Sequence, residues 1–121
     1  MVLVVDGNQD VREMYCTYFT YVGYECIGAA TGDEALRMLH DRVPDLVLLE
    51  ESLPGLDGWQ LLKMIRTDAK LRSVRVVVLT ADVFEAPRQR AADMGADGFA
   101  AKPVLMDDLA ALVRRLLKPT A

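Results

Sequence analysis

Short apolar runs alternate with helix-like patterns along the whole chain, and this alternation restricts the fold more than any other feature. The runs are unbroken, as in strands buried on both faces, and the segments between them carry apolar residues every three or four positions, as on one face of a helix. The expected strands cover residues 1–5, 25–29, 46–49, 73–79 and 98–101, and the expected helices cover residues 9–22, 31–41, 58–67, 87–94 and 106–117.

This alternation predicts an α/β fold, in which a five-stranded parallel sheet carries helices on both faces. Right-handed crossovers leave few topologies, and 2-1-3-4-5 is the common order for five strands. The first and third strands are then neighbours, so Asp6 and Glu50 at their ends are expected to converge. Thr80 and Lys102 lie at the ends of the fourth and fifth strands, on the same edge of the sheet.

Local signals mark several helix ends. Asn8 is a suitable N-cap for the first helix, and Thr31 followed by Glu34 has the spacing of a capping box for the second. Pro87 suits the first turn of the fourth helix, where an N–H would have no partner. These residues predict where the helices begin more closely than periodicity does.

The first helix has a well-defined apolar stripe, and its outer face also carries a tyrosine and a cysteine. Residues outside the stripe, Tyr21 and Cys16, are expected to be exposed. The stripe itself recurs at spacings of three and four and predicts burial of Val11, Met14, Tyr15, Tyr18, Phe19 and Val22.

Composition narrows the class of protein. A chain of 121 residues that is 52% hydrophobic can build one core, so residues 1–121 are expected to form a single domain. The net charge of −4 argues against binding to nucleic acids or anionic membranes, and no apolar run approaches the roughly 20 residues of a transmembrane helix. With no signal peptide, and with Cys16 and Cys26 in no metal or redox spacing, we expect reduced thiols in a cytoplasmic protein.

The motifs at the expected strand ends resemble those of response regulator receiver domains. The resemblance covers almost the whole chain and implies a flavodoxin-like (βα)5 fold. It is carried, in order, by Val4–Asp6, the acid at position 50, Leu53–Gly58, Leu79–Ala81, Gly95–Phe99 and Lys102–Pro103.

The resemblance implies an active site for phosphoryl transfer. Receivers accept a phosphoryl group from a histidine kinase onto an aspartate that ends the third strand, here the position of Glu50. Magnesium in the family is held by three groups: the acceptor, an acid after the first strand (Asp6) and a backbone carbonyl two residues beyond the acceptor (Ser52). A threonine and a lysine, matched by Thr80 and Lys102, contact the phosphoryl oxygens, where positioning and charge neutralisation provide most of the catalysis.

Two departures from the family pattern affect the chemistry. Glu50 replaces the acceptor aspartate, and displacement of an attacking atom by about 1 Å can cost on the order of a hundredfold in rate. Gly7 replaces the second acid after the first strand, which is normally a metal ligand. We therefore expect no cofactor, or weakly bound magnesium on Asp6, Glu50 and Ser52. Glu51 is expected to be a solvated loop acid, with replacement of the lost ligand as the alternative.

The resemblance also implies local conformational states. The family holds the bond corresponding to Lys102–Pro103 in cis and uses residues matching Thr80 and Phe99 as a switch. The permanent carboxylate of Glu50 is expected to point toward Lys102 and Thr80 and to bias this switch, although it brings one negative charge where a phosphoryl group brings about two. We therefore expect one dominant, partly active-like arrangement with Phe99 turned inward. The face from Pro87 to Lys118 is the expected contact surface.

These features lead to one main hypothesis. The chain is expected to be a degenerate receiver of two-component phosphorelay signalling, a phosphorylation-independent interaction module and not an enzyme. Its expected partners are a histidine kinase, a phosphotransferase or a downstream effector, with a homodimer as a further candidate. Two alternatives stay open: a receiver still competent for magnesium-dependent phosphoryl transfer, and a structural dimerisation module of a larger signalling protein.

Overall fold

Five parallel strands form one sheet in residues 1–81 and 85–118, which are the residues that the computed structural model describes. The strand order is β2-β1-β3-β4-β5, so the predicted topology is confirmed. In the register of the central strands, Val4 lies beside both Gly28 and Leu48. The strands are β1 (Val2–Val5), β2 (Cys26–Ala29), β3 (Leu46–Glu50), β4 (Arg75–Thr80) and β5 (Gly98–Ala101).

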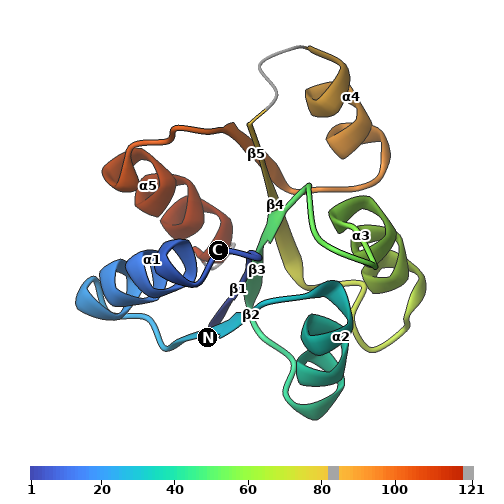
Figure 1. Ribbon diagram of the computed structural model, residues 1–121, viewed down its shortest axis with the longest axis horizontal. Coiled ribbons are helices and arrows are strands. Elements are labelled where there is room, and N and C mark those ends of the chain that lie inside the picture. The colour runs from blue at the N-terminus through green and yellow to red at the C-terminus, as the bar shows by residue number, and fades with distance from the viewer. Residues whose placement is uncertain (82–84, 119–121) are drawn as a thin grey trace.

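Helices cover both faces of the sheet and complete a three-layer α/β architecture. Helices α1 and α5 lie on one face, and α2, α3 and α4 lie on the other (Figure 1). Their bounds are α1 (Gln9–Tyr21), α2 (Gly32–Asp41), α3 (Gly58–Thr67), α4 (Glu85–Asp93) and α5 (Met106–Leu117). The predicted fold class is therefore confirmed.

Side-chain caps fix where the helices start. The Asn8 side chain accepts a hydrogen bond from the Val11 amide at 3.1 Å, as predicted. Thr31 likewise accepts from the Glu34 amide at 3.1 Å, but the Glu34 carboxylate accepts from the Ala30 amide. The complete capping box lies on α3, where the side chains of Asp57 and Gln60 each accept from the other residue's backbone amide.

Two predicted boundaries differ from the structure by two residues, and the others differ by one residue at most. Strand β4 begins at Arg75 because Ser73 and Val74 belong to a turn, in which the Val74 amide bonds the Leu71 carbonyl at 3.0 Å. Helix α4 begins at Glu85, two residues before the predicted start. Pro87 still falls within its first turn, where the missing N–H has no intrahelical partner to lose.

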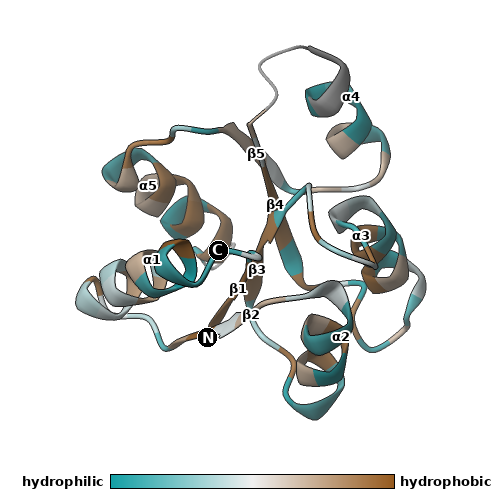
Figure 2. Ribbon diagram, in the orientation of Figure 1, coloured by the Kyte–Doolittle hydropathy of each residue, from teal (hydrophilic) through white to brown (hydrophobic). Residues whose placement is uncertain are grey.

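The core consists of two apolar clusters, one on each face of the sheet. Alternate strand residues point to opposite faces, so Val2 and Val4 pack under α1 and α5, and Leu3 and Val5 pack under α2 and α3. Figure 2 shows the strands as a largely hydrophobic layer between helices whose outer faces are more hydrophilic. Both faces are therefore closed, as unbroken apolar strands require.

Helix α1 corrects part of the predicted stripe. Tyr15 and Phe19 are buried and Tyr21 is exposed, as predicted, but Met14 is exposed, so its predicted burial is wrong. Cys16 is half-buried and packs toward the core, so its predicted exposure is also wrong. A helix turns about 100° per residue, which places Met14 further than Cys16 from the line through Tyr15 and Phe19.

Candidate functional site

The carboxyl ends of four strands bring the predicted site residues to one edge of the sheet. Asp6 directly follows β1, Glu50 ends β3, Thr80 ends β4 and Lys102 directly follows β5. The Lys102 amide donates to the Thr80 carbonyl at 2.7 Å, which ties the last two strand ends together. Parallel strands place such residues side by side at the switch point of the sheet.

The Lys102 ammonium lies between two carboxylates. Its Nζ donates to Asp6 Oδ2 at 2.9 Å and forms an ion pair with Glu50 Oε2 at 2.5 Å. The exposed fractions of the side chains are 23% for Lys102, 8% for Asp6 and 12% for Glu50, so water screens this cluster only partly. The predicted convergence of Asp6 with Glu50 is confirmed, and the structure adds that Lys102 pairs with both.

The charges of the cluster keep Lys102 protonated. Burial acts to lower the pKa of Lys102, but the carboxylates of Glu50 and Asp6 outweigh burial and raise the pKa above its ordinary value. Each of the two acids therefore faces a fixed positive charge at neutral pH. Burial also raises the pKa of Tyr15, a tyrosine of α1 that is close enough to be influenced by the same three charges.

Asp6 has further partners that sequence analysis did not assign to the site. Its Oδ1 accepts from the Asn8 amide at 2.9 Å, while Oδ2 accepts from Lys102. Its backbone carbonyl accepts from the Arg12 guanidinium at 2.8 Å. Arg12 is a charged residue beside the apolar stripe of α1. That position next to the buried face was the one sequence feature that could have placed Arg12 near the site. Both carboxylate oxygens of Asp6 are thus already engaged by the protein.

The donor set fits a magnesium centre poorly. Two carboxylates converge, but both are paired with the single ammonium of Lys102, and residues 1–81 and 85–118 contain no group of three or more histidine, cysteine or acidic side chains placed to hold a metal. Magnesium is usually held by one or two carboxylates and several waters, so these acids could bind it only by giving up part of their pairing with Lys102. The expectation of weak or absent magnesium on Asp6, Glu50 and Ser52 stays a prediction.

Gly7 leaves space where the family has an acid. A Cβ added at Gly7 would lie 3.7 Å from Pro54 Cδ and 3.9 Å from the Ala30 carbonyl oxygen, which are ordinary contacts. The structure therefore tolerates a side chain at this position. The missing ligand reflects the residue type and not a blocked site.

Glu51 is not the solvated acid that we expected. It is half-buried, and its Oε2 is buried without a hydrogen-bond partner among the described residues. Its amide donates to the Leu79 carbonyl at 2.9 Å and its carbonyl accepts from the Gly58 amide at 3.0 Å, so the backbone is fixed between β4 and α3. Tight packing of this loop, which sequence spacing does not reveal, accounts for the burial.

The remaining predicted site residues occupy different environments. Ser52 is exposed in the loop after β3, and Thr80 is buried at the end of β4. Phe99 is half-buried on β5, and the Arg88 guanidinium lies 4.9 Å from the centre of its ring. The switch roles of Thr80 and Phe99 and the inward state of Phe99 remain predictions. The Lys102–Pro103 bond is cis, as predicted.

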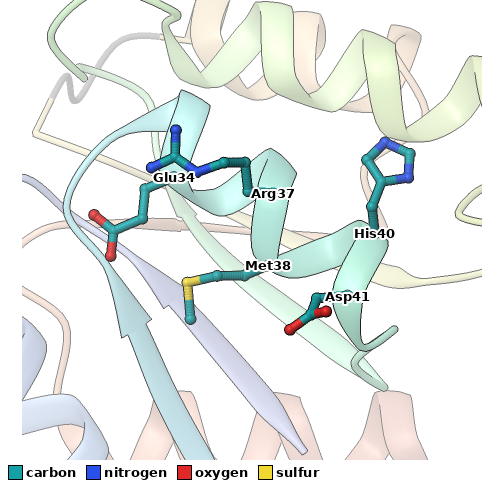
Figure 3. A pocket seen from close by; sticks show the side chains of 5 residues that line it. All are labelled: Glu34, Arg37, Met38, His40 and Asp41. Carbon is teal, nitrogen blue, oxygen red and sulfur yellow. The ribbon is translucent and has the colours of Figure 1, made fainter.

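A separate surface hollow lies on the outer side of α2. Its volume is about 560 Å³, and it is lined by Glu34, Arg37, Met38, His40 and Asp41. Figure 3 shows that these side chains fan out around one helix and do not meet at a common point. His40 is exposed, with Nε2 3.8 Å from Asp68 Oδ2. The chemistry-bearing residues are therefore concentrated at the strand ends and not in this hollow.

Comparisons with known proteins agree with this geometry. The family model for the response regulator receiver domain matches residues 2–114. The phosphate regulon transcriptional regulatory protein PhoB of Klebsiella pneumoniae is 34% identical over 97% of this chain and 51% of its own length. The probable transcriptional regulator ycf27 of Guillardia theta is 34% identical over 98% of this chain and 46% of its own length. The chain thus spans about half the length of the curated relatives that it matches.

Solved structures show the same fold. The receiver domain of NtrX from Brucella abortus has a TM-score of 0.91 and 31% identity, with 99% of this chain and 100% of that chain covered. The signal receiver domain of a histidine kinase from Syntrophus aciditrophicus has a TM-score of 0.88 and 30% identity, with 96% and 88% covered. No helix in the described part of the chain is long and apolar enough to span a membrane.

Proposed function

Because the chain belongs to the response regulator receiver domain family, we propose that it is a receiver whose phosphorylation chemistry has been replaced by a permanent ion-paired cluster. In this proposal it binds its partners without a phosphoryl group on residue 50. Those partners are a histidine kinase, a phosphotransferase or a downstream effector of a two-component pathway. The expected compartment is the cytoplasm, and the domain itself performs no enzymatic reaction.

The observation that carries the proposal is the position of the Lys102 ammonium. In the family, the matching lysine contacts the oxygens of the incoming phosphoryl group. Here its charge is already shared by Asp6 at 2.9 Å and Glu50 at 2.5 Å. An incoming phosphodonor would have to draw Lys102 away from Glu50 and bring its own negative charge beside two carboxylates.

The acceptor residue and the metal site support the same proposal. Glu50 has one more methylene group than aspartate, and this methylene moves the attacking oxygen from its in-line position. Gly7 provides no ligand, and Asp6 is held by Asn8 and Lys102 through both carboxylate oxygens. Phosphoryl transfer depends on positioning and on neutralisation by a metal, and this site is weak in both respects.

The proposed contact surface is the face formed by α4, β5 and α5. The Arg88 guanidinium stacks over Phe99 and joins α4 to β5, which favours a single arrangement of this face. A second copy of the chain is a further candidate for binding here. This surface is a proposal that follows from the family resemblance.

Phosphorylation with a small phosphodonor tests the proposal directly. After incubation with acetyl phosphate and magnesium, intact-mass spectrometry is expected to find no stable phosphorylated species. The Glu50→Asp variant restores the acceptor type and, combined with Gly7→Asp, is the matched positive control. Substantial phosphorylation of the parent chain that disappears in Glu50→Gln would contradict the proposal and favour a competent receiver.

A further inference from the structure

We propose that Cys16 and Cys26 form a reversible disulfide bond through exchange with a small-molecule disulfide such as oxidised glutathione. Their Sγ atoms lie 2.7 Å apart, although ten positions separate the residues in the chain. A disulfide bond is about 2.05 Å long, so the sulfurs need to approach by only roughly 0.7 Å. The pair is separate from the Asp6, Glu50 and Lys102 cluster and forms a modification site of its own.

The pairing follows from how α1 packs on β2. Arg12 lies over Gly28, where an added Cβ would be 3.4 Å from Arg12 Cδ, and Cys16 lies over Cys26. Four residues advance about 6 Å along a helix, and two residues advance about 6.6 Å along a strand. The two contacts therefore keep the same spacing on both elements. Regular packing of the helix on the strand, and not one side-chain rotamer, places the thiols together.

The location permits both reaction and closure. Strand β2 is an edge strand of the sheet, and both cysteines are half-buried beside the core on the α1 side. A small disulfide can reach a half-buried thiol at an edge, whereas a fully enclosed thiol would be protected. Once one sulfur is modified, the other is already adjacent, so the second step is intramolecular and has a high effective concentration.

Cys16 takes the first step. Burial raises the pKa of the Cys26 thiol, and the neighbouring Cys16 raises it further, so Cys26 is rarely ionised. The Cys16 thiolate attacks one sulfur of oxidised glutathione and forms a mixed disulfide, while one glutathione thiolate leaves and takes up the proton lost by Cys16. The Cys26 sulfur then attacks the Cys16 sulfur, its proton passes to the second leaving glutathione, and two protein thiols have been oxidised by two electrons.

The bond would fix α1 to the edge of the sheet near the strand-end cluster. Cys16 lies one helical turn after Arg12, whose guanidinium holds the Asp6 carbonyl at 2.8 Å. A covalent link four residues away restrains the part of α1 that contacts Asp6. We expect slower hydrogen exchange of the amides in α1 and β2 in the oxidised form.

The decisive experiment compares folded and unfolded chains. The reduced chain is equilibrated with reduced and oxidised glutathione at a fixed ratio, with and without urea, then alkylated with a maleimide and weighed intact. The folded chain is expected to lose two hydrogen atoms and to take up no maleimide, with an equilibrium constant for closure at least tenfold above that in urea. Equal or lower closure in the folded chain, or a persistent adduct with glutathione on both thiols, would overturn the proposal.

Single variants identify the bond and its consequence. The chain has two cysteines, so Cys16→Ser and Cys26→Ser can each form only a mixed disulfide or an intermolecular bond. Dithiothreitol should return the parent chain to two alkylatable thiols and each variant to one. It should restore fast exchange in α1 and β2 of the parent chain and leave the exchange rates of both variants unchanged. Exchange rates unaffected by oxidation would refute the restraint on α1. No phosphodonor is used, so this proposal and the proposed function can fail independently.

Discussion

Lys102 is the residue on which the strand-end cluster depends, since its single ammonium is the counter-charge that Asp6 and Glu50 share. Lys102→Met keeps the length of the side chain but leaves two largely buried carboxylates facing each other. We expect the free energy of unfolding to fall by about 2–3 kcal/mol at neutral pH, measured by urea denaturation. Lys118→Met, at the exposed end of α5, is the matched control and should change it by less than about 0.5 kcal/mol. Equal losses of unfolding free energy in the two variants would mean that the Lys102 ammonium contributes nothing to stability.

The same cluster predicts a pH dependence in alkaline solution. The folded-state pKa of Lys102 is raised above the ordinary lysine value of 10.5, so its contribution is fully present below that pH. The contribution is lost as the pH rises through the folded-state pKa. The difference in melting temperature between the parent chain and Lys102→Met should be constant from about pH 8 to 10 and narrow above that range. A difference in melting temperature that widens with pH would show that the pKa of Lys102 is lowered and not raised by folding.

At the scale of elements, the N-terminus of α3 is pressed against the end of β3. A Cβ at Gly58 would collide with the Glu50 carbonyl oxygen and lie 2.9 Å from Glu51 Cα, both of which are backbone atoms that cannot rotate away. Gly58→Ala is expected to cost about 2–3 kcal/mol of stability and to displace Glu50. Gly7→Ala, with its nearest neighbour at 3.7 Å, should change stability by less than about 1 kcal/mol. The melting temperatures of both variants can be measured by calorimetry. Equal melting temperatures would contradict this close packing at Gly58.

Arg66 joins elements at the opposite edge of the sheet, and sequence analysis missed it. Its guanidinium donates to the Val74 carbonyl at 2.7 Å and the Gly95 carbonyl at 2.8 Å, and pairs with Asp97 at 2.7 Å. Asp97 also accepts from the Val76 amide at 2.8 Å. The end of α3 is thereby tied to the start of β4 and to the loop before β5. The apolar periodicity of α3 gives no indication of this link.

At the scale of the whole molecule, the charge state of the strand-end cluster is expected to change the conformation and partner binding of the α4–β5–α5 face. Glu50→Gln removes the charge nearest Lys102 while keeping the shape of the side chain. If Glu50 acts as a permanent substitute for a phosphoryl group, this variant should shift the Phe99 ring resonances and weaken partner binding. Glu34→Gln, on α2, is the control and should leave both unchanged. If Glu50→Gln also leaves both unchanged, the old phosphorylation site has no influence on this face.

Much of the fold and part of the site follow from local patterns. Apolar runs and helical periodicity identified the strands and helices, because burial of one face imposes its period on neighbouring residues. The order of elements restricted the topology, and the topology brought Asp6 to Glu50 and Lys102 to their edge. Errors occurred where tertiary contacts overrode local signals, as at Ser73 in a turn and at Glu51 in a packed loop.

The sequence by itself determined which residues reach the carboxyl edge of the sheet, and the family resemblance rested on their types. Only the tertiary structure decided how their charges are shared: one ammonium for two acids, with Asn8 and Arg12 also bound to Asp6. It also placed Cys16 beside Cys26, which no spacing rule indicated. The physical reason is that periodicity encodes the environment of a side chain, whereas pairing depends on the docking of elements that are distant in the chain.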